Sequence, residues 1–170
     1  MRPLLIVDGY NVIGAWREAG KNRYTFDEAR DKLTHKLAEY SGYKGVEVVV
    51  VFDGYKSDKL STTVETQGPL TVVYTRHGET ADSYIERLVV QSPKYRVVRV
   101  ATSDGDVQNM ALGAGATRIT SRELLMEVEH AHQTGYVAYT KEQPLHRNPL
   151  MDRLPADVRE KLERARRGKE

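Results

Sequence analysis

Five short apolar runs, separated by segments with the spacing of amphipathic helices, constrain the fold of this chain more than any other feature. The clearest run is Val46–Phe52, which is almost continuously apolar and β-branched, as the central strand of a parallel sheet is. The runs expected to form strands are Pro3–Asp8, Val46–Phe52, Leu70–Tyr74, Arg96–Ala101 and Ala116–Ile119. The segments expected to form helices are Phe26–Tyr40, Thr80–Val90, Ser103–Leu112, Ser121–Ala131 and Pro155–Arg167. This alternation predicts an α/β fold with a mainly parallel sheet.

The remaining segments carry the residue types of loops. Gly54–Gly68 is polar and rich in Lys, Ser and Thr, which predicts a loop. Gly135–Pro149 is expected to be irregular, and Tyr136–Tyr139 could form a further short strand. The length of 170 residues predicts one domain. Within it, residues 1–135 would form the α/β part, and residues 136–170 an irregular segment and a basic C-terminal helix.

The composition excludes several kinds of site. The chain has no cysteine, so disulfides and Cys-ligated zinc or iron–sulfur sites are excluded. The apolar run at the N-terminus is short and is interrupted by Asp8, and no run approaches the roughly 18 apolar residues of a membrane span. We therefore expect a cytoplasmic protein with no membrane partner. The net charge is +2, and the basic excess lies in the tail, where residues 147–170 contain eight Lys or Arg and five Asp or Glu.

Acidic residues stand where the predicted strands end. They are Asp8, Asp53, Asp82 with Glu86, and Asp104 with Asp106. Because the carboxyl ends of parallel strands meet at one edge of a sheet, we expect these side chains to converge there. Converging carboxylates repel one another unless a divalent cation fills the space between them. Since Mg²⁺ and Mn²⁺ prefer oxygen ligands and neutralise phosphate charge, the pattern predicts a metal-dependent phosphoryl-transfer enzyme, foremost a nuclease.

Each acid also has an ordinary structural interpretation. The sequences DGYN and FDG could be turns, the acids of GETADSYIE could complement a helix dipole or lie on a solvated face, and those of SDGD could cap a helix. Asn11 could orient a phosphate or a metal-bound water, or it could cap a turn. Ser103 could contact phosphate, or it could be the N-cap of the helix that follows, with Asp106 completing a capping box. The coincidence of all these acids with strand ends favours a shared site.

Two other classes of protein remain as alternatives. A phospho-acceptor receiver domain also has an Asp at a strand end, as at position 53, with Thr or Ser after a later strand. Receivers also need an acidic pair near the first strand and a Lys after the fifth, but Asp8 stands alone and Ile119–Arg122 contains no Lys. The second alternative is a non-catalytic binding module with the same fold as the nuclease.

The motifs DGYNVIG, VVFDG, GETADSYIE and TSDGDVQ, in this order, resemble the YacP-like group of the NYN branch of PIN-like nucleases. The resemblance implies a three-layer α/β/α fold and a Mg²⁺- or Mn²⁺-dependent endoribonuclease acting on single-stranded RNA. It implies that Asp8, Asp82 and Asp104 are the catalytic metal ligands. The supporting candidates are Asn11, Asp53, Glu86, Ser103 and Asp106. The group includes a ribosome-associated endonuclease that cleaves mRNA during translation, so mRNA and the ribosome are the implied partners. In the non-catalytic alternative, the module would bind RNA or the ribosome without cleavage.

RNA bound near the acids would be held mainly by cations along its backbone. The candidates are Lys56, Lys59, Arg76, His77, Arg147 and Arg153. Each of these could instead be a solvated surface charge. Tyr10 and Tyr55 flank strand-end acids and could stack on bases, or they could pack against neighbouring loops.

Overall fold

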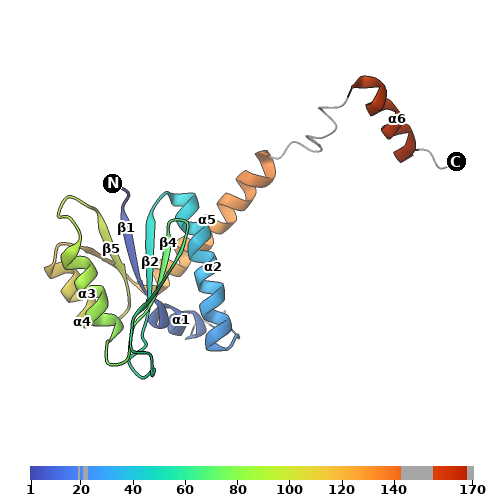
Figure 1. The fold of residues 1–170 in the computed structure, drawn as a ribbon. Coiled ribbons are helices and arrows are strands. Elements are labelled where there is room, and N and C mark those ends of the chain that lie inside the picture. Colours follow the sequence, from blue (N-terminus) through green and yellow to red (C-terminus); the bar gives the residue numbers. More distant parts are fainter. Residues whose placement is uncertain (19, 21–22, 143–154, 168–170) are drawn as a thin grey trace. The chain divides into compact units, whose positions relative to one another are not determined.

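The computed structural model describes residues 1–18, 20, 23–142 and 155–167 of the chain. Two compact units are present, Met1–Gly135 and Tyr136–Glu170. The first unit contains the whole sheet and the helices that pack on it (Figure 1). The carboxylates and cations predicted to form the site lie in this first unit, except Arg147 and Arg153, which lie outside the described residues.

A six-stranded sheet of order β3-β4-β2-β1-β5-β6 forms the centre of the first unit. Its strands are β1 (Leu4–Asp8), β2 (Glu47–Phe52), β3 (Thr63–Gln67), β4 (Leu70–Tyr74), β5 (Val98–Ala101) and β6 (Thr117–Ile119). β1 lies between β2 and β5 and runs parallel to both, and Asp8 at its end pairs in register with Val51. β2 with β4 and β5 with β6 are also parallel, whereas β3 is antiparallel to β4. The predicted mainly parallel α/β sheet is confirmed.

Helices cover both faces of the sheet, and each face buries its own apolar core. Successive residues of a strand point to opposite faces, so Leu5 and Val7 of β1 join one core while Leu4 and Ile6 join the other. The helices are α1 (Gly9–Glu18), α2 (Phe26–Lys44), α3 (Ala81–Gln91), α4 (Gly105–Gly113) and α5 (Ser121–Glu142). α1, α2 and α5 cover the first face, and α3 and α4 cover the second (Figure 1). This arrangement confirms the predicted three layers.

The segment 54–68, predicted to be a loop, contains the edge strand β3. β3 pairs with β4 through a turn at Gly68, whose φ is +59°. All but the first residue of β3 are exposed, so the strand needs no apolar side chains and its sequence, TVETQ, gives no periodic signal. The loop prediction is therefore wrong for Thr63–Gln67.

Two helical segments also differ from the prediction. Gly9–Glu18 is helix α1, although DGYN also matches a turn; the helix begins directly after β1 and buries Val12 and Ile13. Residues 135–142, predicted to be irregular with a strand at 136–139, belong to α5. Ala131 is the last buried residue of α5 among those whose burial the structure describes, and the apolar spacing identified the helix up to this residue.

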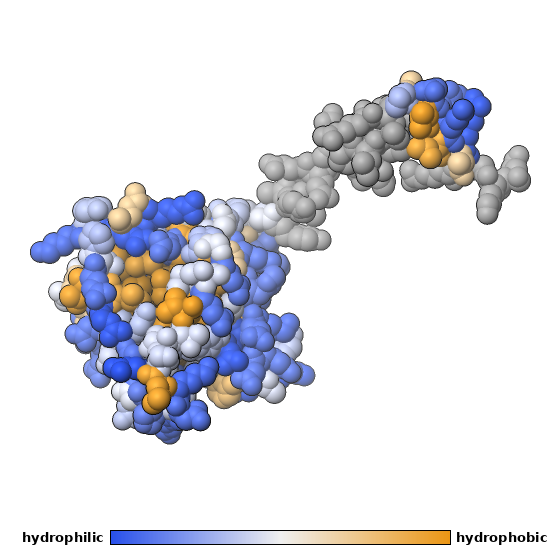
Figure 2. Space-filling view, in the orientation of Figure 1, coloured by the Kyte–Doolittle hydropathy of each residue, from blue (hydrophilic) through white to orange (hydrophobic). Residues whose placement is uncertain are grey.

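The second unit contains the end of α5 and helix α6 (Ala156–Arg167), in agreement with the predicted helix near Pro155. Val158 and Leu162 are exposed on α6, four residues apart on one side of the helix. Figure 2 shows the corresponding apolar stripe among hydrophilic residues. In the described part of the chain, none of the helices combines the length and apolar character needed to cross a membrane.

Candidate active site

Asp8 occupies the carboxyl end of the central strand β1 and is 9% exposed. Its Oδ2 accepts a hydrogen bond of 3.0 Å from Thr102 Oγ1, which follows the neighbouring strand β5. The chain passes from Asp8 directly into α1 at Gly9, where an added Cβ would lie 2.4 Å from a ring carbon of Phe52. Glycine is therefore required at this turn, because any side chain would displace α1 or the buried Phe52 ring. β1 and β5 flank the point where the order of the strands reverses, which is where open α/β sheets bind ligands.

The pKa of Asp8 is raised from 3.8 to about 6. Burial is the largest cause, and the negative charges of Asp82 and Asp104 act in the same direction. The hydrogen bond from Thr102 acts in the opposite direction because it stabilises the ionised carboxylate. A buried acid that other acids repel has a strong electrostatic preference for a nearby positive charge.

Asp104 is placed by the start of helix α4. It is the N-cap residue, and its Oδ1 accepts hydrogen bonds from the backbone N–H groups of Asp106 at 2.9 Å and Val107 at 3.4 Å. The backbone N–H of Asp104 in turn donates to Thr102 Oγ1 at 3.1 Å, so one hydroxyl contacts both strand-end acids. The prediction of Ser103 as the N-cap is wrong. Asp106 lies in the first turn of α4 and is exposed.

Asp82 reaches the same edge of the sheet from the first turn of α3. Asp82 is exposed as a whole residue, but its carboxyl group is partly shielded from water. This partial burial is the largest cause that raises its pKa, followed by the charges of Asp104, Asp53 and Asp106. The charges of Asp82 and Asp104 thus act on Asp8, and those of Asp53, Asp104 and Asp106 act on Asp82. We call these five residues the carboxylate cluster. Glu86 lies one turn further along α3 and is exposed.

Asp53 connects the end of β2 to the start of α3. Its Oδ1 accepts a hydrogen bond of 2.8 Å from the N–H of Tyr55, which is the geometry of a turn cap. Its Oδ2 accepts a hydrogen bond of 3.2 Å from the N–H of Ala81, the residue before Asp82. Both oxygens thus bind backbone groups, and Asp53 helps to hold Asp82 at the site.

Asn11 and Ser103 tie together three segments that are distant in sequence. Asn11 Oδ1 accepts hydrogen bonds from the N–H of Ser103 at 2.8 Å and from Ser121 Oγ at 2.6 Å. Ser103 Oγ accepts a hydrogen bond of 3.3 Å from the N–H of Ser121. These contacts fix the β5–α4 turn, which carries Asp104, against the first turns of α1 and α5. The sequence analysis did not identify Ser121 as a residue that holds Asn11 and Ser103. Its only signal in the sequence is its position at the start of a predicted helix.

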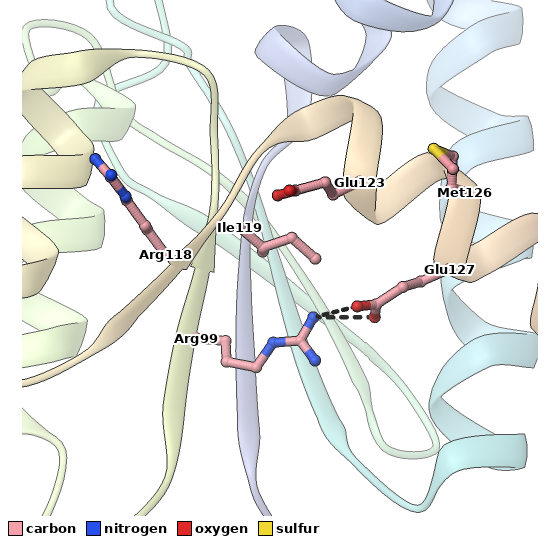
Figure 3. Close-up of a pocket in the computed structure, with 6 residues that line it drawn as sticks. All are labelled: Arg99, Arg118, Ile119, Glu123, Met126 and Glu127. Carbon is pink, nitrogen blue, oxygen red and sulfur yellow. Dashed lines mark hydrogen bonds and ion pairs between the residues drawn. The ribbon is translucent and has the colours of Figure 1, made fainter.

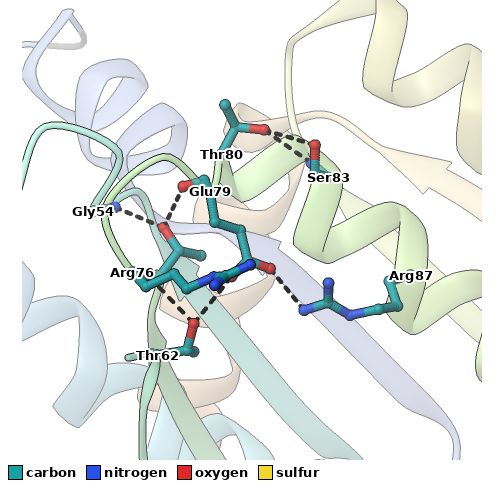
Figure 4. A network of polar contacts seen from close by, with 8 residues as sticks. Gly54, Thr62, Arg76, Glu79, Thr80, Ser83 and Arg87 are labelled. Atoms are coloured by element: carbon teal, nitrogen blue, oxygen red, sulfur yellow. Dashed lines mark hydrogen bonds and ion pairs between the residues drawn. The ribbon is translucent and has the colours of Figure 1, made fainter. Parts of the chain in front are cut away.

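Glu79, in the motif GETAD, organises the turn before α3 (Figure 4). It accepts hydrogen bonds from Arg87 at 2.7 Å and Thr62 at 3.0 Å, and it pairs with Arg76 at 3.6 Å. Burial acts to raise the pKa of Glu79, but the hydrogen bonds and charges of these neighbours outweigh it, so the pKa is lowered. The sequence analysis did not select Glu79, whose hydrogen-bond partners Thr62 and Arg87 lie 17 residues before it and 8 residues after it.

The predicted RNA-binding residues of the first unit gather near this turn. Lys56 and Lys59 are exposed in the loop after Asp53. Arg76 is exposed but paired with Glu79. His77 is exposed, and its Nδ1 lies 2.7 Å from the carbonyl oxygen of Ser57. Backbone hydrogen bonds from the N–H groups of His77 and Gly78 to the carbonyl oxygens of Lys59 and Tyr55 join the turn after β4 to the loop after β2.

A pocket of about 450 Å³ lies elsewhere, between the β5–β6 edge and α5 (Figure 3). Its lining residues are Arg99, Arg118, Ile119, Glu123, Met126 and Glu127. Arg99 donates to both carboxylate oxygens of Glu127, at 3.0 and 3.1 Å, and Tyr40 donates to the same carboxylate at 2.9 Å. The charge of Arg99 is thus already paired with Glu127. We interpret the polar side chains of this pocket as contacts that connect β5, α2 and α5.

Replacing Thr102 by valine is expected to raise the pKa of Asp8 further, because the hydroxyl that stabilises its ionised form is removed. The shift can be followed by NMR titration of the Asp8 carboxyl carbon between about pH 3 and 9. Thr117→Val is the matched control, since Thr117 lies in β6 and its hydroxyl contacts the carbonyl oxygen of Val98 at 3.4 Å. An unchanged or lowered Asp8 pKa in Thr102→Val would contradict the role given to this hydrogen bond.

Comparison with known proteins identifies relatives along most of the chain. Residues 5–167 match the family described as the YacP-like NYN domain. The YacP protein of Bacillus subtilis (strain 168) is 43% identical over 128 residues, which cover 74% of this chain and 75% of that protein. A crystal structure of Rae1 (YacP) from Bacillus subtilis has a TM-score of 0.67 at 38% identity, covering 99% of this chain and 96% of that one. A structure of a single-residue mutant of the same protein also has a TM-score of 0.67, at 35% identity over 95% and 99% of the two chains. The chain belongs to the YacP-like NYN domain family.

Proposed function

We propose that this protein is a metal-dependent endoribonuclease that cleaves single-stranded RNA, with mRNA on the translating ribosome as its substrate. Membership of the YacP-like NYN family supports a nuclease-like, RNA-related function. The observation that carries the proposal is the carboxylate cluster at the strand ends, in which the pKa of the central Asp8 is raised to about 6. In phosphodiester hydrolysis such a cluster can bind a divalent cation that neutralises phosphate charge. Without a cation, the repulsion between the carboxylates destabilises the folded protein.

The chemistry of the carboxylate cluster suits a hard divalent cation. All five side chains offer oxygen ligands, which Mg²⁺ and Mn²⁺ prefer, and a cation would relieve the repulsion that raises the pKa values of Asp8 and Asp82. Among the described residues, no three His, Asp or Glu side chains are already arranged as a metal site. The proposal therefore includes a rotation of the exposed Asp82 side chain towards Asp8 and Asp104 when the cation binds.

The residues of the site have distinct proposed tasks. Asp8, Asp82 and Asp104 would hold the cation, which when bound neutralises phosphate oxygens and makes a water molecule more acidic. Thr102 holds Asp8 and the backbone of Asp104 in place. Asp53 places the start of α3, and Asn11 places the β5–α4 turn through Ser103. Lys56 and Lys59, exposed beside the carboxylate cluster, would contact the RNA backbone.

The choice of RNA and of the ribosome rests on relatives more than on geometry. The motifs resemble a group that includes a ribosome-associated endonuclease of mRNA, and the solved relatives are structures of Rae1 (YacP). Cations and exposed aromatic rings close to the carboxylate cluster are compatible with a single-stranded nucleic acid. The basic excess of the tail also suits a polyanionic partner.

The test compares cleavage of an mRNA in two settings, as naked RNA and in a translating extract, with Mg²⁺, with Mn²⁺ and with a chelator. We expect the wild type to cleave the mRNA in the translating extract, and we expect no cleavage with the chelator. Asp82→Asn should reduce the cleavage rate about 100-fold or more. Removing a metal ligand should cost at least as much activity as removing a residue that only supports a ligand. Asp31→Asn is the matched control, since Asp31 is an exposed acid of α2 outside the carboxylate cluster.

Other outcomes point to the alternative classes. Equal cleavage by the wild type and Asp82→Asn would rule out the proposed site. Binding to RNA or ribosomes without cleavage under any of these conditions would favour a non-catalytic module. Incorporation of phosphate at Asp53 from a small phosphodonor would favour a receiver domain.

A further inference from the structure

Two exposed aromatic rings stack on each other in the segments that follow β2 and β4. The ring centroids of Tyr55 and His77 are 6.4 Å apart, and the planes are inclined by 27°. Tyr55 is 49% exposed and His77 is also exposed, so the pair gains little from burial. Exposed rings that share a plane direction offer a flat surface on which a further aromatic group can stack.

Backbone contacts fix the two segments that carry these rings, although both residues lie outside helices and strands. The N–H of Gly78 donates to the carbonyl oxygen of Tyr55 at 3.1 Å, and the N–H of His77 donates to that of Lys59 at 2.8 Å. His77 Nδ1 lies 2.7 Å from the carbonyl oxygen of Ser57. The turn can adopt this shape because Gly78 has a φ of +78°. The stacking surface is therefore formed before any ligand binds, which lowers the entropic cost of binding.

The Tyr55–His77 pair is connected directly to the carboxylate cluster through Asp53. One oxygen of Asp53 accepts from the N–H of Tyr55, and the other accepts from the N–H of Ala81, next to Asp82. Lys56 and Lys59 are exposed on the same loop and supply positive charge. An aromatic surface flanked by cations is the combination that binds single-stranded nucleic acid, with stacking on the bases and charge contacts to the backbone.

We propose that Tyr55 and His77 form a stacking site for one nucleobase of single-stranded RNA and thereby position the adjacent phosphodiester at the carboxylate cluster. This inference rests on the proposed function for its ligand. Stacking requires an exposed base face, so a base inside a duplex cannot use the site, and substrates paired at this position are excluded. Because every base has a π-face, the site selects single strands without selecting a sequence.

The test measures binding separately from cleavage, with a single-stranded RNA that carries the fluorescent base 2-aminopurine at successive positions. In the full-length Asp82→Asn protein, which we expect not to cleave, stacking should quench the fluorescence at one position. Adding Tyr55→Ala should abolish this quenching and raise the Kd about tenfold. Adding Tyr55→Phe instead should leave the quenching and the Kd unchanged, because the ring is kept. Tyr95→Ala is the matched control, because Tyr95 is 79% exposed and lies before β5, at the opposite edge of the sheet.

An abasic nucleotide at the quenched position provides a second measurement. The abasic nucleotide should weaken binding to the Asp82→Asn protein as much as Tyr55→Ala does. It should cause no further loss of affinity in the protein that carries both Asp82→Asn and Tyr55→Ala. Quenching at no position, or quenching that Tyr55→Ala leaves unchanged, overturns the stacking site whether or not the wild type cleaves RNA. Tyr55-dependent quenching in a protein that never cleaves supports the stacking site and refutes the nuclease. An unchanged melting temperature of Tyr55→Ala shows that any loss of binding is local.

Discussion

Replacing Asp8 by asparagine is expected to abolish cleavage and, at the same time, to stabilise the metal-free protein by about 2 to 3 kcal/mol at pH 7.5. The folded chain raises the pKa of Asp8 from 3.8 to about 6, so it holds this proton more tightly than the unfolded chain does. Stability is therefore lost as the pH rises from about 4 to about 6, and the full penalty remains above that range. Asparagine keeps an oxygen that can accept the hydrogen bond from Thr102 but carries no charge.

The measurement is the free energy of unfolding in urea with a chelator, between about pH 4 and 8, for the wild type, Asp8→Asn and the control Asp31→Asn. The advantage of Asp8→Asn should fall below about 1 kcal/mol near pH 4, because the carboxyl is then protonated in the folded protein and close to half protonated in the unfolded chain. Adding Mn²⁺ at pH 7.5 should stabilise the wild type and leave Asp8→Asn nearly unchanged, because the variant lacks one of the proposed ligands. An advantage of equal size at pH 4 and pH 8 would show that the charge of Asp8 is not its source.

Replacing Gly54 by alanine is expected to destabilise the protein by about 3 kcal/mol or more. An added Cβ would lie 1.8 Å from the backbone oxygen of Thr75, a distance that no change of side-chain rotamer can relieve. Thr75 cannot move away easily, since its N–H donates to Phe52 and its hydroxyl accepts from Gly54 and donates to the Glu79 carbonyl. The same displacement should disturb Asp53, so cleavage should fall together with stability.

Gly42→Ala is the matched control for this variant. Gly42 lies inside α2 with no heavy atom within 4 Å of an added Cβ, and alanine should stabilise the helix there by up to about 1 kcal/mol. Urea unfolding gives the free energy of both variants. Equal effects of the two substitutions would contradict the close approach of Gly54 to Thr75.

The parts of the fold that the sequence predicted are those with a local signal. β1, β2 and β4 are apolar runs, and the strand-end position of Asp8 and Asp53 follows from them. The β3 strand had no such signal because it is polar and pairs along only one edge.

The contacts that shape the site depend on approaches between distant segments, which no local pattern records. Thr102 and Asp8 are 94 residues apart, and Asn11 and Ser121 are 110 apart. Strand-end acids could therefore be selected from the sequence, whereas the hydroxyls and amide that hold them could not. Asp104 shows most clearly what a local pattern cannot decide. The sequence allowed either a helix cap or a member of the carboxylate cluster, and in the structure the same side chain is both.

The hydrogen bonds of Asn11 to Ser103 and Ser121 have a consequence for the order in which the protein is made. Among the strands of the sheet, β1 comes first in the sequence and lies at the centre, yet its partner β5 begins only at Val98. A nascent chain that ends between Asp104 and Ser121 contains Asp8, Asp82 and Asp104. It lacks the hydrogen bonds of Ser121 to Asn11 and Ser103, which fix the turn that carries Asp104. These contacts can form only after Ser121 has been synthesised, so fragments that end before it would lack the assembled carboxylate cluster.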